Sequence, residues 1–201
     1  MQKNNNSNGS LSFIIFLVFV LSFTLQWFPE NGLAEEADLQ YLPTRYGIAV
    51  MGGNTYTPEN NTTFALLSGF ILFDYKKVWH NKAPEPLRFK VEFNAGVTTR
   101  PETCAIVSSG IFALYYLNSL TSDVLRPYVE GGIGIIYTDF QIKGQGLRFN
   151  FNPQMGIGTE FKTGPNVTNF SALRLHHISN GGLHHDNSGI NSVVLMVGRY
   201  F

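Results

Sequence analysis

Residues 87–97 read LRFKVEFNAGV, and apolar side chains stand at every odd position of this stretch. The even positions from Arg88 to Asn94 carry charged or amide side chains. Successive side chains of a β-strand point to opposite faces, so this alternation predicts a strand with one apolar and one polar face. Residues 149–161, FNFNPQMGIGTEF, repeat the pattern, with most apolar side chains again at odd positions.

Similar stretches recur along the chain, separated by turn sequences rich in proline, glycine and asparagine. Each stretch is about ten residues long, the length that a tilted strand needs to cross the hydrocarbon layer of a membrane. Residues 140–148 fit the pattern poorly and are expected to form a long loop or a strand extension. We therefore expect an all-β chain, an eight-stranded antiparallel β-barrel, with strands at 45–53, 64–76, 87–97, 104–117, 125–139, 149–161, 168–180 and 189–201.

The charge balance of the chain argues against a nucleic-acid partner, because 14 basic and 14 acidic side chains leave no net field. The single cysteine, Cys104, excludes an intramolecular disulfide and is expected to be a packed strand residue. No stretch after the N-terminal segment holds eighteen consecutive apolar residues, so no membrane-crossing helix is expected there.

Residues 1–34 have the composition of a cleaved signal peptide. A polar start with one lysine precedes an apolar run from Leu11 to about Phe28, and small residues follow up to Ala34. A retained membrane anchor is the alternative, since the run approaches the length that spans a bilayer. Cleavage is favoured because no basic stop-transfer cluster follows the run. Residues 35–201 are then a single exported barrel domain.

Two closed architectures use eight antiparallel strands. A soluble lipocalin-like barrel points its apolar faces inward around a ligand, whereas an outer-membrane barrel points them toward lipid. Eight strands leave a lumen just wide enough for side chains, so inward-pointing charges of both signs can plug it. The final strand, which ends on Phe201, resembles the last strand of bacterial outer-membrane barrels and favours that architecture and location. The charged side chains of the polar faces are Arg88, Lys90, Glu92, Arg126, Glu130, Glu160 and Arg174.

Residues 173–182 read LRLHHISNGG and place reactive side chains on an apolar face. His177 and Ser179 share the parity of Leu175, and Asn191 shares that of the apolar side chains after it. With both termini on the periplasmic side, these three polar side chains are expected on the outer wall, near the outer-leaflet interface. Polar groups are costly on a lipid-facing wall and rarely stand there without a use.

The segment His177-Ile178-Ser179-Asn180, a glycine-bearing turn, and Asn187-Ser188-Gly189-Ile190-Asn191 resemble the signature of the lipid A 3-O-deacylases, the PagL family. The resemblance covers the mature chain in architecture and residues 174–191 in detail. It implies a bacterial outer-membrane esterase that removes a 3-hydroxyacyl chain from lipid A without a cofactor. Lipopolysaccharide of the outer leaflet is then the partner, and a homodimer is left open.

The resemblance assigns Ser179 as the nucleophile and His177 as its general base. A serine hydroxyl needs a base to take its proton, and the base needs a group that orients it. The family's glutamate falls on Asn191, whose amide can orient an imidazole but cannot stabilise its positive charge. Asp186 in the turn is the back-up carboxylate. The candidate oxyanion donors are Asn180, Gly181 and Gly182, which as an alternative merely turn the chain.

The remaining histidines are expected to have no catalytic role. His176 has the opposite parity and should point into the lumen, and His184 and His185 lie in an exposed loop. No metal site is expected there, because adjacent loop histidines lack supporting carboxylates beyond Asp186. Two rival functions stay open: a non-catalytic structural or adhesive outer-membrane barrel with a decayed site, and a periplasmic lipid-binding barrel.

Overall fold

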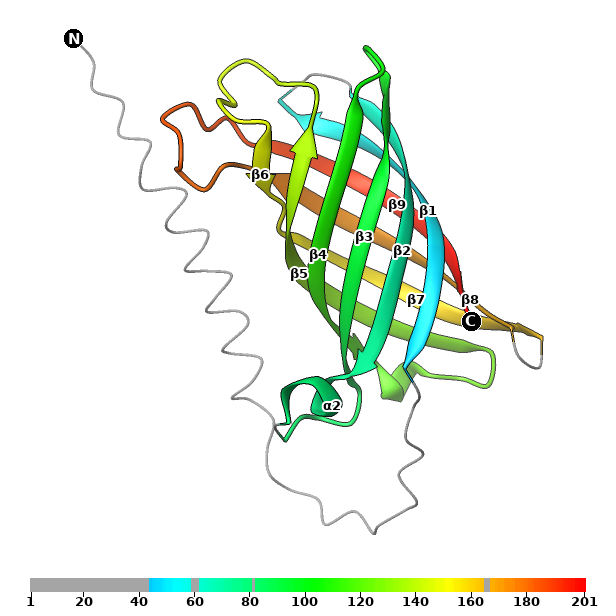
Figure 1. Ribbon diagram of the computed structural model, residues 1–201. Helices are drawn as coiled ribbons and strands as arrows, with labels where there is room; N and C mark the ends of the chain where they lie inside the picture. Colours follow the sequence, from blue (N-terminus) through cyan, green and yellow to red (C-terminus); the bar gives the residue numbers. More distant parts are fainter. Residues whose placement is uncertain (1–43, 59–61, 81, 165–166) are drawn as a thin grey trace. The chain divides into compact units, whose positions relative to one another are not determined.

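The computed structural model describes residues 44–58, 62–80, 82–164 and 167–201, and within them the chain forms a closed β-barrel (Figure 1). The expected signal peptide, residues 1–34, lies outside the described residues. The strands are β1 (Arg45–Thr57), β2 (Thr63–Asp74), β3 (Leu87–Arg100), β4 (Ala105–Tyr116), β5 (Leu125–Thr138), β6 (Phe149–Phe151), β7 (Gln154–Gly164), β8 (Val167–Ile178) and β9 (Ile190–Tyr200).

Every pairing between neighbouring strands is antiparallel, and β1 with β9 joins the two ends of the chain. The pairing of β4 with β5 completes the closure. Both β6 and β7 pair with β5, so together they fill one position, and the barrel has the eight strands that the sequence predicts. Between them Asn152 exchanges backbone hydrogen bonds with Gly134, and Pro153, which has no N–H group, interrupts the strand.

Two details of the sequence prediction are corrected, and one alternative that it left open is settled. The strand expected over 149–161 is interrupted at 152–153. The strand expected to reach residue 76 ends at Asp74, whose side chain accepts a 2.9 Å hydrogen bond from Lys76 N and caps the short helix α2 (Tyr75–Trp79). Residues 140–148 form a loop and not a strand extension. A 3-10 turn, η1 (Asn118–Leu120), lies between β4 and β5.

The outer wall of the barrel is apolar. Phe93, Ile157 and Leu195 expose 55%, 62% and 55% of their surface, and their neighbours in sequence point inward. This arrangement is that of an outer-membrane barrel, in which apolar side chains meet lipid, and the lipocalin-like alternative is wrong. Among the described residues no helix is long and apolar enough to cross a membrane.

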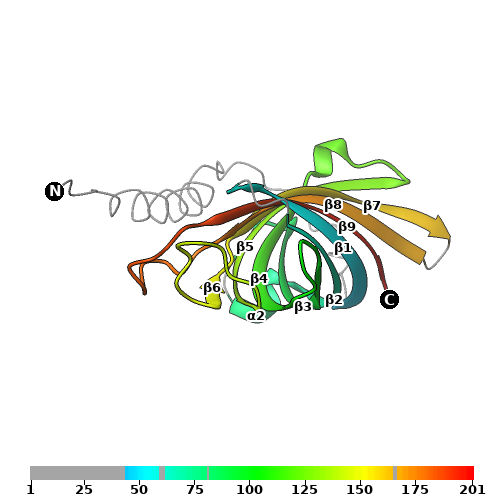
Figure 2. The same cartoon turned by 90° about the horizontal axis from the view of Figure 1, so that it is seen from above.

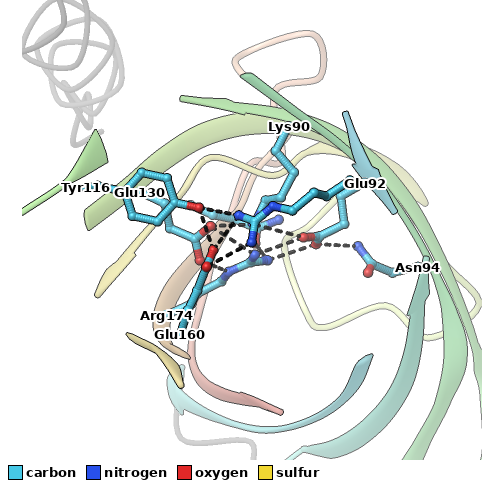
Figure 3. A network of polar contacts seen from close by, with 9 residues as sticks. Lys90, Glu92, Asn94, Tyr116, Glu130, Glu160 and Arg174 are labelled. Carbon is cyan, nitrogen blue, oxygen red and sulfur yellow. Dashed lines mark hydrogen bonds and ion pairs between the residues drawn. The ribbon is translucent and has the colours of Figure 1, made fainter. Parts of the chain in front are cut away.

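Buried charges of both signs fill the lumen, as the polar strand faces predict (Figure 3). Arg174 lies 2.8 Å from Glu92 and 2.7 Å from Glu130, and none of its side chain is exposed. Lys90 contacts the same two carboxylates. In a second group of lumen residues, Glu160 pairs with Arg45 at 2.7 Å and accepts a hydrogen bond from Tyr116. Because each charge has an opposite partner, the network closes the lumen without leaving an isolated buried ion.

The connections divide between the two ends of the barrel. Helix α2, the η1 segment and the C-terminus lie toward one end, and the loops at 139–148 and 179–189 lie side by side at the other (Figures 1 and 2). Backbone contacts join these two loops, since Ser188 N donates to Gly144 O at 2.6 Å. The polar residues of the resemblance therefore lie at the end away from the C-terminus.

Candidate active site

His177 and Asn191 stand opposite each other on β8 and β9. The imidazole Nδ1 lies 2.7 Å from the Asn191 Oδ1, and both side chains are half-buried. The flanking Leu175 and Val193 are exposed on the outer wall, while the inward neighbours His176 and Ser192 are buried. Strand alternation thus holds this pair on the outside of the barrel, and His176 points into the lumen as the sequence predicts.

The contact between these two side chains selects one tautomer of the histidine. A carboxamide oxygen only accepts hydrogen bonds, so Nδ1 carries the proton and donates it to Asn191. The lone pair of the imidazole then lies on Nε2. A general base of this kind is held by an orienting group at one ring nitrogen and takes the proton at the other, which in His177 is Nε2.

Ser179 lies one pleat beyond His177 on the same face of the chain and is half-buried. Its backbone forms an isolated bridge to Phe151 of β6, with hydrogen bonds of 2.8 Å and 3.1 Å. The His177 N–H donates to Pro153 O at 3.0 Å, across the interruption between β6 and β7. Strand pairing on the β6–β7 side therefore fixes the backbone of both residues.

Gly189 provides the surface against which the imidazole packs. A Cβ atom at this position would lie 2.6 Å from His177 Cε1, which is closer than side chains approach one another. Sequence reasoning did not single out Gly189, although it stands two residues before Asn191 within the quoted motif. Position 189 requires glycine because its backbone contacts His177 across the hairpin, and this contact can be recognised only when the strand register is known.

Asn180 holds the turn that follows the serine. Its side chain is fully buried, and Nδ2 donates to Gln145 O at 3.1 Å and to Asp186 O at 2.8 Å. Its Oδ1 accepts from Gly182 N at 2.9 Å. The donors of Asn180 and Gly182 are thus used within the turn, whereas Gly181 is exposed with a φ of 64°. The oxyanion role expected for these three residues stays a prediction, and the bonding pattern favours Gly181 among them.

The loop at 139–148 packs against the same turn. Gln145 is fully buried, and its backbone oxygen accepts a hydrogen bond from the side-chain amide of Asn180. The Cα of Gly146 lies against His184, because a Cβ there would be 2.3 Å from the imidazole Nδ1. These contacts join segments that are far apart in sequence and identify Gln145 as a supporting residue that sequence reasoning missed. The pattern of apolar and polar residues gave no signal for it.

Asp186, the back-up carboxylate, contacts His185, with 3.2 Å between its Oδ1 and His185 Nε2. About half of its side chain is exposed, at 51%. The sequence offers Asn191 and Asp186 as residues that could orient His177. In the structure Asn191 contacts His177, whereas Asp186 contacts His185 of the turn.

Comparison with known proteins identifies a family to which the chain is similar. A family model described as Lipid A 3-O-deacylase (PagL) matches residues 68–200. A curated relative, the lipid A deacylase PagL of Pseudomonas aeruginosa (strain PAO1), is 32% identical over 87 residues, which are 42% of this chain and 48% of the relative. The matched segment thus spans about half the length of that relative.

Two solved structures are similar to the chain. The crystal structure of the outer membrane enzyme PagL superimposes with a TM-score of 0.55 at 20% identity, over 76% of this chain and 97% of that chain. The N-terminal β-barrel domain of Pseudomonas aeruginosa OprF gives a TM-score of 0.47 at 16% identity, over 78% of this chain and 97% of that chain. The first of these likenesses shows the fold of the chain.

Proposed function

Because the chain belongs to the lipid A 3-O-deacylase (PagL) family, we propose that it is an outer-membrane esterase acting on lipid A. The bond cleaved is the ester that links a 3-hydroxyacyl chain to the lipid A sugar, and lipopolysaccharide of the outer leaflet is the substrate. The observation that carries the proposal is the His177–Asn191 contact on the outer wall, in which His177 stands two residues before Ser179 on the same face of the chain.

In the proposed mechanism the Ser179 hydroxyl attacks the ester carbonyl carbon while His177 Nε2 takes its proton. The tetrahedral intermediate collapses, and the sugar oxygen leaves with the proton that the imidazolium returns. A water molecule then attacks the acyl-serine, with His177 again accepting the proton, and the free 3-hydroxy acid and the serine are released. The reaction needs no cofactor, because serine supplies the nucleophile. The 2.7 Å Nδ1–Oδ1 contact supports the role of Asn191 in holding His177 for both steps.

The turn at residues 180–182 is proposed to stabilise the negatively charged oxygen of the tetrahedral intermediate. Backbone N–H groups of glycines can approach an ester oxygen closely, and donors aimed at the developing negative charge lower the barrier. The hydrogen bonds of Asn180 to Gln145 and Asp186 hold this turn in place, so that Gly181 can present its N–H without rearrangement.

The outer-wall location suits a substrate that is itself part of the membrane. Phe151, which pairs with Ser179, and Leu175 and Leu173 farther along β8 are exposed, with 39%, 46% and 49% of their surfaces accessible. An acyl chain can lie against these side chains while its ester reaches the interface, so the lipid need not leave the bilayer. Whether two copies act as a homodimer stays a prediction.

The direct test uses purified, folded protein and lipid A in detergent micelles. Wild type is expected to release a free 3-hydroxy fatty acid and to leave lipid A lighter by one acyl chain. Ser179→Ala is expected to lower the rate by at least about 10³-fold, because the nucleophile is removed while the fold stays. Equal release by wild type and Ser179→Ala would refute the serine mechanism.

A non-catalytic outer-membrane barrel is the second candidate, and one observation favours it. The family's glutamate is replaced by Asn191, so the imidazolium formed during the reaction lacks a negative partner. This candidate predicts no release of fatty acid by wild-type protein that is demonstrably folded.

A further inference from the structure

A second cluster of chemically active side chains lies in the turn between β8 and β9, outside the His177–Ser179–Asn191 group. It consists of His184, His185 and Asp186, and one ligand atom from each lies within 4.8 Å of the others. We propose that these three side chains form a surface zinc site that fastens the turn. The sequence analysis expects no metal here; the observation that supports the proposal is that Asp186 lies close to both histidines.

The three side chains are already brought together by the turn. The two imidazoles lie 4.2 Å apart between ring centres and 32° from parallel. His184 Nδ1 accepts a 3.1 Å hydrogen bond from Asp186 N, and His185 Nε2 lies 3.2 Å from Asp186 Oδ1. His184 also packs against Gly146 of the neighbouring loop. His184 is thus held by the neighbouring loop, and His185 and Asp186 lie beside it.

The distances are within reach of zinc coordination. Zinc binds histidine nitrogen and carboxylate oxygen at about 2.1 Å, so ligand atoms of a tetrahedral site lie about 3.4 Å apart. The observed 4.8 Å limit therefore requires the atoms to close by little more than an ångström. His185 and Asp186 can make this movement, because 81% and 51% of their side chains are exposed. Three protein ligands leave the fourth position to water.

The chemistry of the ligands selects the metal. Two imidazoles with one carboxylate suit zinc and similar transition metals, whereas calcium and magnesium require several oxygen ligands. The consequence would be mechanical, because residues 184–186 lie between Ser179 and Asn191 in the hairpin. A metal that joins these side chains would cross-link the turn without touching the proposed catalytic group.

The test titrates zinc into the full, folded protein in lipopolysaccharide-free detergent micelles, after removal of any polyhistidine tag. Isothermal titration calorimetry is expected to give one zinc ion per chain, with no competition from calcium or magnesium. His185→Asn is expected to weaken zinc binding by at least about tenfold. His80→Asn is the matched control, since His80 is another exposed histidine, and asparagine tolerates its left-handed backbone at φ 53°.

Hydrogen-exchange mass spectrometry provides the second readout. Zinc is expected to slow exchange in the peptide that contains residues 180–188 in wild type and not in His185→Asn. Zinc affinity that is unchanged in His185→Asn, equal competition by calcium, or no zinc binding by wild type would overturn the proposal. These outcomes do not depend on esterase activity, so the zinc site and the proposed function can fail separately.

Discussion

Replacing Asn191 by aspartate tests the pairing of the imidazole directly. Aspartate has the same shape as asparagine, so the 2.7 Å contact with His177 Nδ1 is expected to be kept. The substitution adds one negative charge to the atom pair and changes little else. We therefore expect kcat to rise, because the transition state contains an imidazolium and the ground state does not.

The size of the rise follows from the geometry of the pair. Two unit charges about 4 Å apart attract by about 1 kcal/mol in bulk water and by about 4 kcal/mol at an effective dielectric constant of 20. His177 and Asn191 are half-buried, so solvent screening places the gain between these limits, at about 2 kcal/mol. Because about 1.4 kcal/mol of barrier corresponds to a tenfold rate, kcat should increase about 30-fold.

The assay measures initial rates of fatty-acid release from lipid A micelles by wild type, Asn191→Asp and Asn191→Leu. The leucine variant keeps the branching of the side chain and removes the hydrogen bond, so its kcat should fall by at least about tenfold while KM changes little. Should wild type prove silent, as the decayed-site alternative holds, Asn191→Asp is expected to gain activity. Rates that are the same in all three proteins would refute the orienting role of Asn191.

Three further substitutions probe the supports of the site and of the barrel. Gly189→Ala should reduce kcat by at least about tenfold because its methyl group would displace the imidazole, whereas Gly52→Ala, with nothing within 4 Å of the added carbon, should be neutral in the same assay. Arg174→Met should destabilise the barrel by about 3–5 kcal/mol in urea unfolding, since it leaves two buried carboxylates to share a single positive charge, that of Lys90. Arg148→Ala removes only a half-exposed ion pair and should cost less than about 1 kcal/mol, so equal losses would contradict the lumen assignment. Asn180→Asp keeps the acceptor and loses both amide donors, so kcat should fall and hydrogen exchange in the turn should accelerate, and unchanged exchange would show that the turn does not depend on these bonds.

The barrel could be predicted from the sequence because strand alternation is a local property. Each stretch such as 87–97 reports its own inside and outside faces, and the register simply joins stretches that already have the right length. The lumen network was foreseeable on the same basis, since Arg174 and its carboxylate partners all occupy the polar parity. The interruption at Asn152 and Pro153 was visible only as one proline in an otherwise regular strand.

The parts of the site that escaped prediction depend on contacts between distant segments. The opposition of His177 and Asn191 follows from parity and hairpin length, which the sequence contains. The burial of Gln145 under Asn180 joins residues 35 positions apart in two irregular loops, where no periodicity exists to place them. The closeness of Asp186 to the two histidines involves neighbouring residues, but it depends on the path of an irregular turn, which no periodicity predicts.

Mass spectrometry of lipid A tests the central claim most directly. Lipid A from bacteria that express the wild-type protein in their outer membrane should be lighter by one 3-hydroxyacyl chain than lipid A from bacteria that express Ser179→Ala at the same level. Identical lipid A masses from the two strains, with both proteins folded in the outer membrane, would contradict the account.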